Sequence, residues 1–356
     1  MIRFPVIIKA IYFKFPAAII FFLMCFPGFG SPPARATEQP PAGSPEFVLK
    51  LSAVAPEGTS WADTAHKFQK YVEQKSAGRI KVIWYLGGIM GDEPDEFLKI
   101  KMGQLQGAGF ANVGLGMIAP ETRILSLPFL FNSPEEIDFV LDQMQPQFQR
   151  LFEEKGFYLA GWLDIGFSYW FLQKPVESIR DFPQCRMWAW KKDPVITEFA
   201  ELLGFQNVPV GFPDLLMALK TGQLDSFYSP LYAALALQWY AYAKYIIDLP
   251  FTLPPSAIVM DMKFLAGLPP DLRKIIKEAW DLYLPELRKI SRVDNEKTYQ
   301  GFLKLGIKEI KLSEDNVKAI REKSRPLYQK FSGQYYPAWL LTRLQDTLAE
   351  YRSQKK

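Results

Sequence analysis

The sequence predicts an α/β protein of two lobes, with a ligand cleft between the lobes and helices near the C-terminus. Its 356 residues suffice for roughly two domains. Short apolar strands alternate with amphipathic helices, a pattern typical of βαβ units in a mainly parallel sheet. That alternation starts a second cycle past the middle of the chain. A composition of 49% hydrophobic and 22% charged residues excludes a disordered chain.

Residues 1–36 have the pattern of a signal peptide. A basic leader precedes an apolar run over 15–26, and Ala34-Arg35-Ala36 fits a small-x-small cleavage site. The run has about a dozen residues, fewer than the roughly 20 that cross a bilayer. An uncleaved anchor is the alternative, and a lipid on Cys25 is disfavoured by the bulky methionine before it. We therefore expect a mature chain from about Thr37, in the periplasm.

The charge balance argues against nucleic-acid binding. The whole chain has a formal charge of +4, which equals the four basic side chains of residues 1–36, where no acidic residue occurs. The mature chain is therefore close to neutral and lacks the basic footprint of a nucleic-acid-binding protein.

Residues that bind metals or act as nucleophiles are scarce. The chain has one histidine, His66, and the mature part keeps one cysteine, Cys185. Metal sites and disulfide frameworks need clusters of such residues, so we expect no metal, no cofactor and no enzyme activity. The acidic group within 92–96 lies at a predicted helix start, where carboxylates complement the helix dipole.

The first cycle follows a flexible tether over residues 37–45. Period-2 and helical spacings then alternate, and a helix can begin at Thr59 or Ser60. The expected elements are a strand at 47–53, a helix ended by Gly78, a strand at 80–85, a helix at 94–102 and a strand at 107–113.

The second cycle contains shorter strands and several Gly-terminated helices. An amphipathic helix begins at Pro269-Pro270, and more helical patterns follow it. The expected strands are 158–162, 170–172, 186–190, 208–210 and 225–228. The expected helices are 194–203, 213–221 and a buried one at 231–243.

Five motifs resemble the periplasmic substrate-binding subunits of TRAP transporters, the DctP-type receptors. They occur in that family's order and spacing over about residues 46–285. The motifs are Gly78–Val82 with Gly87–Asp92, Leu127–Phe131, Pro175–Met187, Ala218–Asp225 and Leu268–Pro270.

The resemblance implies the two-lobed fold of periplasmic binding proteins, closing on a small molecule and presenting it to TRAP permease subunits. Some similar receptors also work with a helical-repeat partner protein. We expect residues 46–162 with 254–290 to form lobe I. Residues 163–253 with 291–356 then form lobe II and its packing helices.

Two positions depart from the pattern of the family. Its members usually hold a ligand carboxylate with an arginine, but Trp188 occupies that position and Arg186 lies two residues too early. The family's frequent asparagine falls on Ser229, just before Pro230. Losing one partner of a desolvated ion pair typically costs about 2–5 kcal/mol, so recognition of a simple acid is in doubt.

Aromatic residues can replace ionic recognition, because each buried apolar fragment contributes about 1.5–3 kcal/mol. Trp188 and Trp190 are two apart on a strand and share one face. We therefore predict a hydrophobic pocket for an amphipathic or lipid-like ligand. Other aromatic residues on segments expected near the cleft are Phe212, Phe227, Tyr228 and Trp239.

Three further predictions concern polar contacts and turns. Tyr169 and Gln238 are candidates for hydrogen bonds that orient the ligand. Gly88 either contacts the ligand or, as we favour, serves a turn.

Two other functions remain open: a receptor for a small organic acid that uses another cation, such as Arg186, and an exported enzyme. No nucleophile–base pair supports the enzyme.

Overall fold

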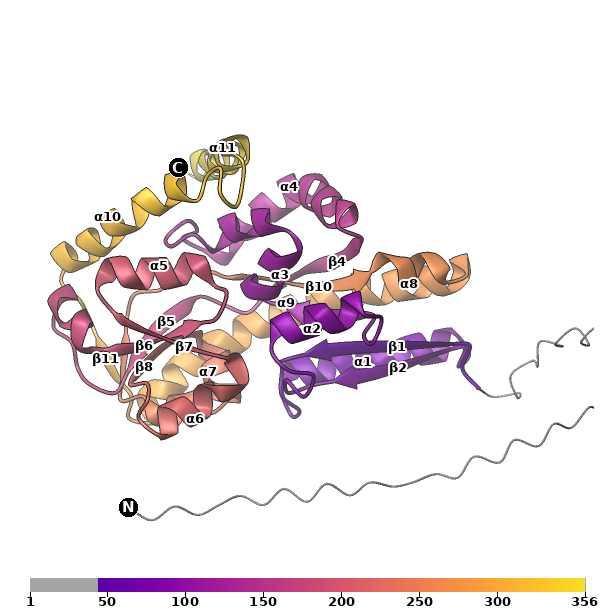
Figure 1. Cartoon of the computed structure of the whole chain (residues 1–356), viewed down its shortest axis with the longest axis horizontal. Helices are drawn as coiled ribbons and strands as arrows, with labels where there is room; N and C mark the ends of the chain where they lie inside the picture. Colours follow the sequence, from indigo (N-terminus) through magenta and orange to yellow (C-terminus); the bar gives the residue numbers. More distant parts are fainter. Residues whose placement is uncertain (1–43, 356) are drawn as a thin grey trace, which may run out of the picture. The chain divides into compact units, whose positions relative to one another are not determined.

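The computed structural model describes residues 44–355, and these contain two β-sheets flanked by helices (Figure 1). This arrangement confirms the predicted α/β class. The predicted signal peptide and most of the predicted tether lie outside the described residues. Within the described range, no helix combines the length and the hydropathy needed to span a bilayer.

The first sheet has the strand order β2-β1-β3-β10-β4. β1 pairs in parallel with β2 and β3, whereas β10 is antiparallel to both β3 and β4. Its strands are β1 (Phe47–Ala53), β2 (Ile80–Tyr85), β3 (Gly107–Phe110), β4 (Phe157–Asp164) and β10 (Pro255–Asp261).

The second sheet has the order β11-β9-β5-β8-β6-β7. β6 is parallel to β7 and β8, and β5 is antiparallel to β8 and β9. Its strands are β5 (Ser168–Leu172), β6 (Arg186–Trp190), β7 (Gln206–Val210), β8 (Ser226–Pro230), β9 (Tyr245–Ile247) and β11 (Lys308–Ile310).

Both sheets are mainly parallel, as predicted, and each contains one antiparallel strand among the described residues: β10 in the first sheet and β5 in the second. The antiparallel pairs arise where the chain passes between the sheets, from β4 to β5 and from β9 back to β10. These short crossings replace the helical crossover that a parallel pair requires.

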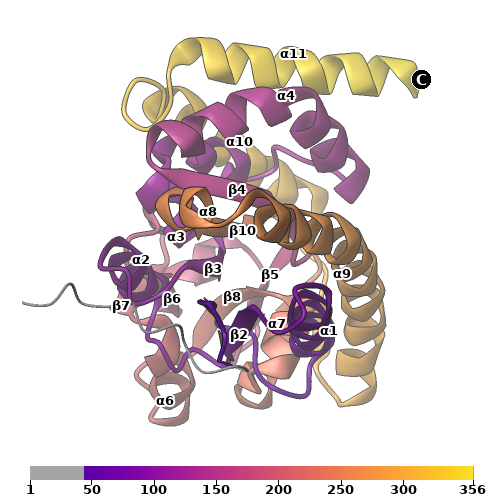
Figure 2. The same cartoon turned by 90° about the vertical axis from the view of Figure 1, so that its right-hand side faces the viewer.

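Helices surround the sheets in layers (Figures 1 and 2). α5 packs on β6 and β7 and is covered by α10, while α4 packs on β4 and is covered by α11. The helices are α1 (Ser60–Lys75), α2 (Glu93–Lys101), α3 (Asn112–Ile118), α4 (Pro134–Glu154), α5 (Pro194–Leu203), α6 (Leu215–Lys220), α7 (Leu231–Ala236), α8 (Met262–Gly267), α9 (Pro270–Lys304), α10 (Glu314–Lys330) and α11 (Ala338–Gln354). Four 3-10 helices complete them: η1 (Pro120–Ser126), η2 (Ile179–Gln184), η3 (Phe212–Asp214) and η4 (Trp239–Tyr242).

The long helix α9 links elements of both sheets. It packs against α1, β4 and α7, and Figure 2 shows it running past α1 and α7. Residue 290, where we placed a lobe boundary, lies within this uninterrupted helix.

Two predicted elements end earlier than expected. β3 stops at Phe110 because Ala111 becomes the N-cap of α3, where the Glu93 carboxylate accepts backbone hydrogen bonds. The helix predicted over 231–243 ends at Ala236, since Gln238 has left-handed backbone (φ 61°) and η4 follows.

Stacked aromatic side chains fill the core. Beside the first sheet, Phe68 of α1 stacks on Trp280 of α9 with ring centroids 3.7 Å apart. In the second, Trp170 stacks on Phe251 at 4.1 Å. Aromatic pairs of this kind add to the free energy gained by burial alone. Cys185 is buried as well, among the apolar side chains of the core.

Candidate functional site

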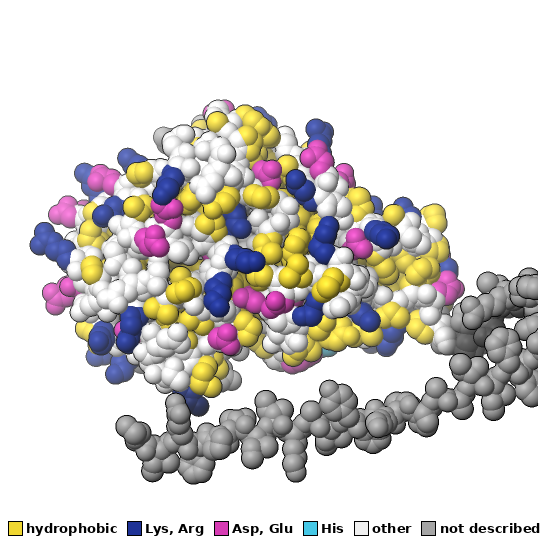
Figure 3. Space-filling model, in the orientation of Figure 1, with side chains coloured by type: hydrophobic (Ala, Val, Ile, Leu, Met, Phe, Trp, Pro, Cys, Tyr) yellow, Lys and Arg dark blue, Asp and Glu magenta, His cyan; other side chains and the backbone are white. Residues whose placement is uncertain are grey.

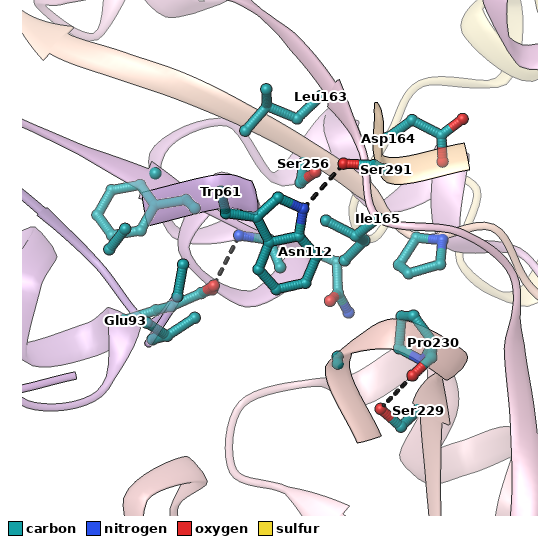
Figure 4. A pocket seen from close by; sticks show the side chains of 18 of the residues that line it. Trp61, Glu93, Asn112, Leu163, Asp164, Ile165, Ser229, Pro230, Ser256 and Ser291 are labelled. Carbon is teal, nitrogen blue, oxygen red and sulfur yellow. Dashed lines mark hydrogen bonds between the residues drawn. The ribbon is translucent and has the colours of Figure 1, made fainter. Parts of the chain in front are cut away.

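A cavity of about 160 Å³ receives side chains from both sheets and from the segments that cross between them (Figure 4). Trp84 of β2 and Gly109 of β3 line it from the first sheet, and Trp188 and Tyr228 line it from the second. Ile165 lines it from the segment that joins β4 to β5. The cavity thus lies where the predicted cleft was expected.

An aromatic cluster forms one wall of the cavity. The Trp188 ring stacks on Trp190 (5.7 Å, 24°) and on Tyr228 (5.2 Å, 23°). Phe212 and Trp239 meet it edge-on at 6.2 and 5.7 Å. Flat rings held against one another leave a smooth apolar surface.

The Trp188 side chain is fixed by its strand and by a hydrogen bond. Its indole Nε1 donates to the carbonyl of Val210 at 3.0 Å, on the neighbouring strand β7. Only 2% of the residue is exposed. Trp190, two residues on, lines the same cavity, in keeping with the alternation of a strand.

Six of the ten predicted site residues line this cavity, and four do not. The six are Trp188, Trp190, Phe212, Tyr228, Ser229 and Trp239. The four that lie outside the lining are Gly88, Tyr169, Phe227 and Gln238.

Strand alternation explains two of the four. Phe227 precedes Tyr228 on β8, so its side chain points to the opposite face and stacks on Phe171 at 4.8 Å. Tyr169 likewise turns away and packs 5.8 Å from Tyr299. Burial raises the pKa of the Tyr169 hydroxyl to about 12.

Turn geometry explains the other two. Gly88 has φ 72° and its N–H bonds the carbonyl of Ala53, so its backbone belongs to the turn after β2. Glycine adopts this conformation without the steric cost of a Cβ. Gln238 is exposed in the turn between α7 and η4.

Two acidic residues line the cavity. They are Glu93 and Asp164, and no lysine, arginine or histidine lines the cavity in the described part of the chain. Asp164 is paired with Arg292, whose Nε lies 2.6 Å from its Oδ2. Glu93 accepts the N–H groups of Ala111 and Gly114, both at 2.6 Å, and burial raises its pKa to about 8.

Arg186, which we considered as a replacement clamp, is exposed and occupied elsewhere. Its guanidinium pairs with Asp225, with Nη2 3.1 Å from Oδ2, and it is absent from the cavity lining. His66, expected to have no catalytic role, is exposed and contacts Glu57.

Several lining residues escaped the sequence analysis. Trp61 lies in the first turn of α1, and its Nε1 donates to Ser291 Oγ at 2.8 Å across 230 residues (Figure 4). Asn112 was placed in a strand, yet it begins α3 and donates to Asp193 at 2.7 Å. Their place after β1 and β3, at the carboxyl ends of parallel strands, was the available signal.

The surface differs from the cavity in its mixture of charges. On the face drawn in Figure 3, basic and acidic side chains are interspersed rather than gathered by sign. Hydrophobic side chains occur among them on the same face.

Comparison with known proteins gives matches over most of the chain. A solute-binding protein of Chromohalobacter salexigens is 25% identical over 266 residues, covering 74% of this chain and 78% of that one. The C4-dicarboxylate-binding periplasmic protein DctP of Rhodobacter capsulatus is 22% identical over 271 residues, covering 76% and 81%.

Solved structures share the fold. The sugar acid binding protein of Advenella mimigardefordensis, in complex with galactonate, superposes with a TM-score of 0.80 at 19% identity, covering 86% of this chain and 99% of that chain. A TRAP periplasmic solute-binding protein of Shewanella oneidensis with bound succinate also gives 0.80, at 20% identity and with 86% and 100% covered.

The model of bacterial extracellular solute-binding protein family 7, named DctP, matches residues 51–334. This match agrees with the five motifs and confirms a binding protein rather than an enzyme. The chain belongs to the DctP family of extracellular solute-binding proteins, the receptors of TRAP transporters.

Proposed function

We propose that this protein is a periplasmic TRAP-type receptor that captures a hydrophobic or amphipathic ligand in the aromatic cavity and delivers it to membrane permease subunits. The observation that carries the proposal is the lining of the cavity. Trp188, which we predict to replace the family's arginine, lines it together with other aromatic side chains, and its acidic residues are Glu93 and Asp164.

The energetics favour apolar contact in this cavity. A micromolar ligand needs about 8 kcal/mol of binding free energy. Burying three or four apolar fragments at about 1.5–3 kcal/mol each supplies a comparable amount. A carboxylate would instead lose its hydration with no lining cation among the described residues to compensate.

A receptor for a small organic acid is the alternative. It is supported by the galactonate and succinate that structural neighbours bind. A non-standard cation would then have to replace the clamp. Arg186 is paired with Asp225, and the buried Arg123 lies outside the lining, with its guanidinium over the Tyr335 ring. Neither side chain reaches the cavity in this arrangement.

Two measurements distinguish the two functions: which molecule the purified protein retains, and which ligands raise its melting temperature. The chain is purified without detergent and extracted with organic solvent, and the extract is analysed by mass spectrometry. A long-chain molecule in stoichiometric amount supports the proposal. Thermal stabilisation of the emptied protein by succinate or galactonate, with no effect of aliphatic ligands, would contradict it.

A helical-repeat partner protein and the permease are parts of the proposal that need their own test. We expect a tagged receptor, cross-linked in its native membrane fraction, to capture the permease subunits in preference to unrelated membrane proteins. A tagged receptor from the same family with an acid ligand serves as the control.

A further inference from the structure

We propose that the polar end of the ligand is uncharged and is received by the hydroxyl groups of Ser126 and Ser256. This inference rests on the proposed function and narrows the ligand to a neutral amphiphile, such as an alcohol, an ether, an ester or an amide. It excludes free fatty-acid anions and alkylammonium cations as preferred ligands.

The two hydroxyl groups are buried and have no partner. Ser126 ends η1 and is 1% exposed, and Ser256 lies in β10 and is 3% exposed. Both residues line the cavity, and neither Oγ has a hydrogen-bond partner among the described residues. Buried hydroxyl groups are normally hydrogen-bonded, so two orphans beside one cavity indicate a group that arrives with the ligand.

Neighbouring hydroxyl residues make this part of the cavity polar. Thr252 Oγ1 donates to the carbonyl of Ser126 at 3.0 Å, and the carbonyl of Thr252 accepts the N–H of Ser168 at 2.8 Å. Thr252 and Ser168 also line the cavity, and Figure 4 labels Ser256 among the lining side chains. The hydroxyl group of a serine can donate or accept, which suits a neutral oxygen or amide.

An anionic head group is disfavoured because the described lining offers it no cation. The acidic lining residues are Glu93, which burial keeps mostly protonated near neutral pH, and Asp164, which already pairs with Arg292. The two Glu93 oxygens already accept backbone N–H groups. A carboxylate would therefore be desolvated next to acceptors, without a cation in the described lining.

A cationic head group is disfavoured for a different reason. Arg292 already pairs with Asp164 at 2.6 Å. Cation recognition by aromatic residues requires access to a ring face. The Trp188 ring is stacked on both Trp190 and Tyr228, so its faces are turned to other rings. With anionic and cationic head groups both disfavoured, a neutral head group fits these contacts best.

The test compares ligands of one chain length and different head groups. Dodecanol, methyl dodecanoate, dodecanoate, dodecyltrimethylammonium and plain dodecane each displace a fluorescent apolar probe from the emptied protein near neutral pH. We expect the alcohol and the ester to bind about tenfold tighter than the carboxylate and the ammonium, the ratio that one satisfied hydrogen bond sustains.

Serine variants identify the groups responsible. In S126A/S256A the advantage of dodecanol over dodecane should fall about tenfold, while dodecane binds at least as well as before. The matched control is S324A. Ser324 is also buried, but it lies outside the cavity lining and its Oγ donates to the carbonyl of Arg321 at 2.7 Å. That variant should keep the dodecanol-to-dodecane affinity ratio of the natural chain.

Each outcome has one meaning. Dodecanoate binding as tightly as dodecanol, or an unchanged dodecanol-to-dodecane ratio in S126A/S256A, overturns the neutral head group and leaves the apolar receptor standing. If no aliphatic ligand displaces the probe while succinate stabilises the protein, the proposed function fails, and the inference falls with it. Thermal unfolding of each variant confirms that it is folded.

Discussion

The indole Nε1 of Trp190 lies 3.2 Å from each carboxylate oxygen of Asp92. This contact joins β6 of the second sheet to the N-cap of α2, beside the first sheet. The same carboxylate accepts the backbone N–H of Phe212 at 3.1 Å. Trp190 and Phe212 both line the cavity, so one buried side chain holds two elements of its wall.

Asp92→Ala should weaken ligand binding and lower stability. It removes the cap of α2 and leaves the N–H groups of Trp190 and Phe212 without acceptors, at a cost of about 1–3 kcal/mol. We expect weaker binding of a fluorescent apolar probe and a lower unfolding midpoint.

Asp95→Ala is the control for Asp92→Ala, because Asp95 shares the capping box but does not appear among the contacts of Trp190. It should lower stability while preserving probe affinity. Equal losses of affinity in the two variants would show that the helix cap alone matters.

Trp188→Arg should exchange one ligand class for another. The guanidinium takes the place of an indole that is 2% exposed, so the variant loses aromatic contact and has to desolvate a charge. We expect the apolar probe to bind at least about tenfold more weakly, since a buried aromatic fragment contributes about 1.5–3 kcal/mol. Succinate should then raise the melting temperature of the variant.

Trp188→Phe is the control for the arginine variant, since it keeps an aromatic ring and loses the bond to Val210. Its probe affinity should lie between those of the natural chain and Trp188→Arg. Unchanged binding in Trp188→Arg would remove Trp188 from the site.

Phe227→Ala and Phe212→Ala should distinguish a residue needed for stability from a residue needed for ligand binding. Phe227 is 1% exposed, stacks on Phe171 and lies behind the lining residue Trp239 with ring centroids 6.1 Å apart, so its loss should cost about 3–5 kcal/mol in the free energy of unfolding. Probe affinity of the folded protein should stay near the natural value. Phe212 lines the cavity and is partly exposed, so its variant should bind about tenfold more weakly with a smaller loss of stability. Denaturant titration and probe binding measure both.

Glu96→Gln should alter how stability depends on pH. Burial in α2 raises the Glu96 pKa from 4.5 to about 7, so the folded state holds a proton that the unfolded chain releases. The stability that Glu96 contributes is present below pH 4.5 and is lost as the pH rises through about 7. Glutamine has the same shape and does not ionise.

The variant should therefore gain stability relative to the natural chain between pH 4.5 and 7, by roughly 3 kcal/mol in all. Urea titrations across that range measure the difference. Parallel curves for the two proteins would show that Glu96 does not carry this dependence. Glu93, with a pKa raised to about 8 by burial, should lower the free energy of unfolding further as the pH rises toward 8 in both proteins.

Local signals predicted most of the elements that surround the cavity. Period-2 alternation marked β1 and β2, and the strand β6 with Trp188 and Trp190 was found in the expected place. The antiparallel strand β10 and helix α4 were missed. A continuous apolar run such as that of β10 has no alternation to read, because the strand is buried on both faces.

By itself, the sequence determined the family and the α/β class, since motifs and periodicity are properties of neighbouring residues, and it predicts that Trp188 replaces an arginine. The tertiary structure alone decided which side chains share the cavity. Trp61 meets Ser291 across 230 residues, and Asp92 meets Trp190 across 98. Such pairs depend on how two sheets and α9 pack together, and packing is set by the fit of many distant side chains at once.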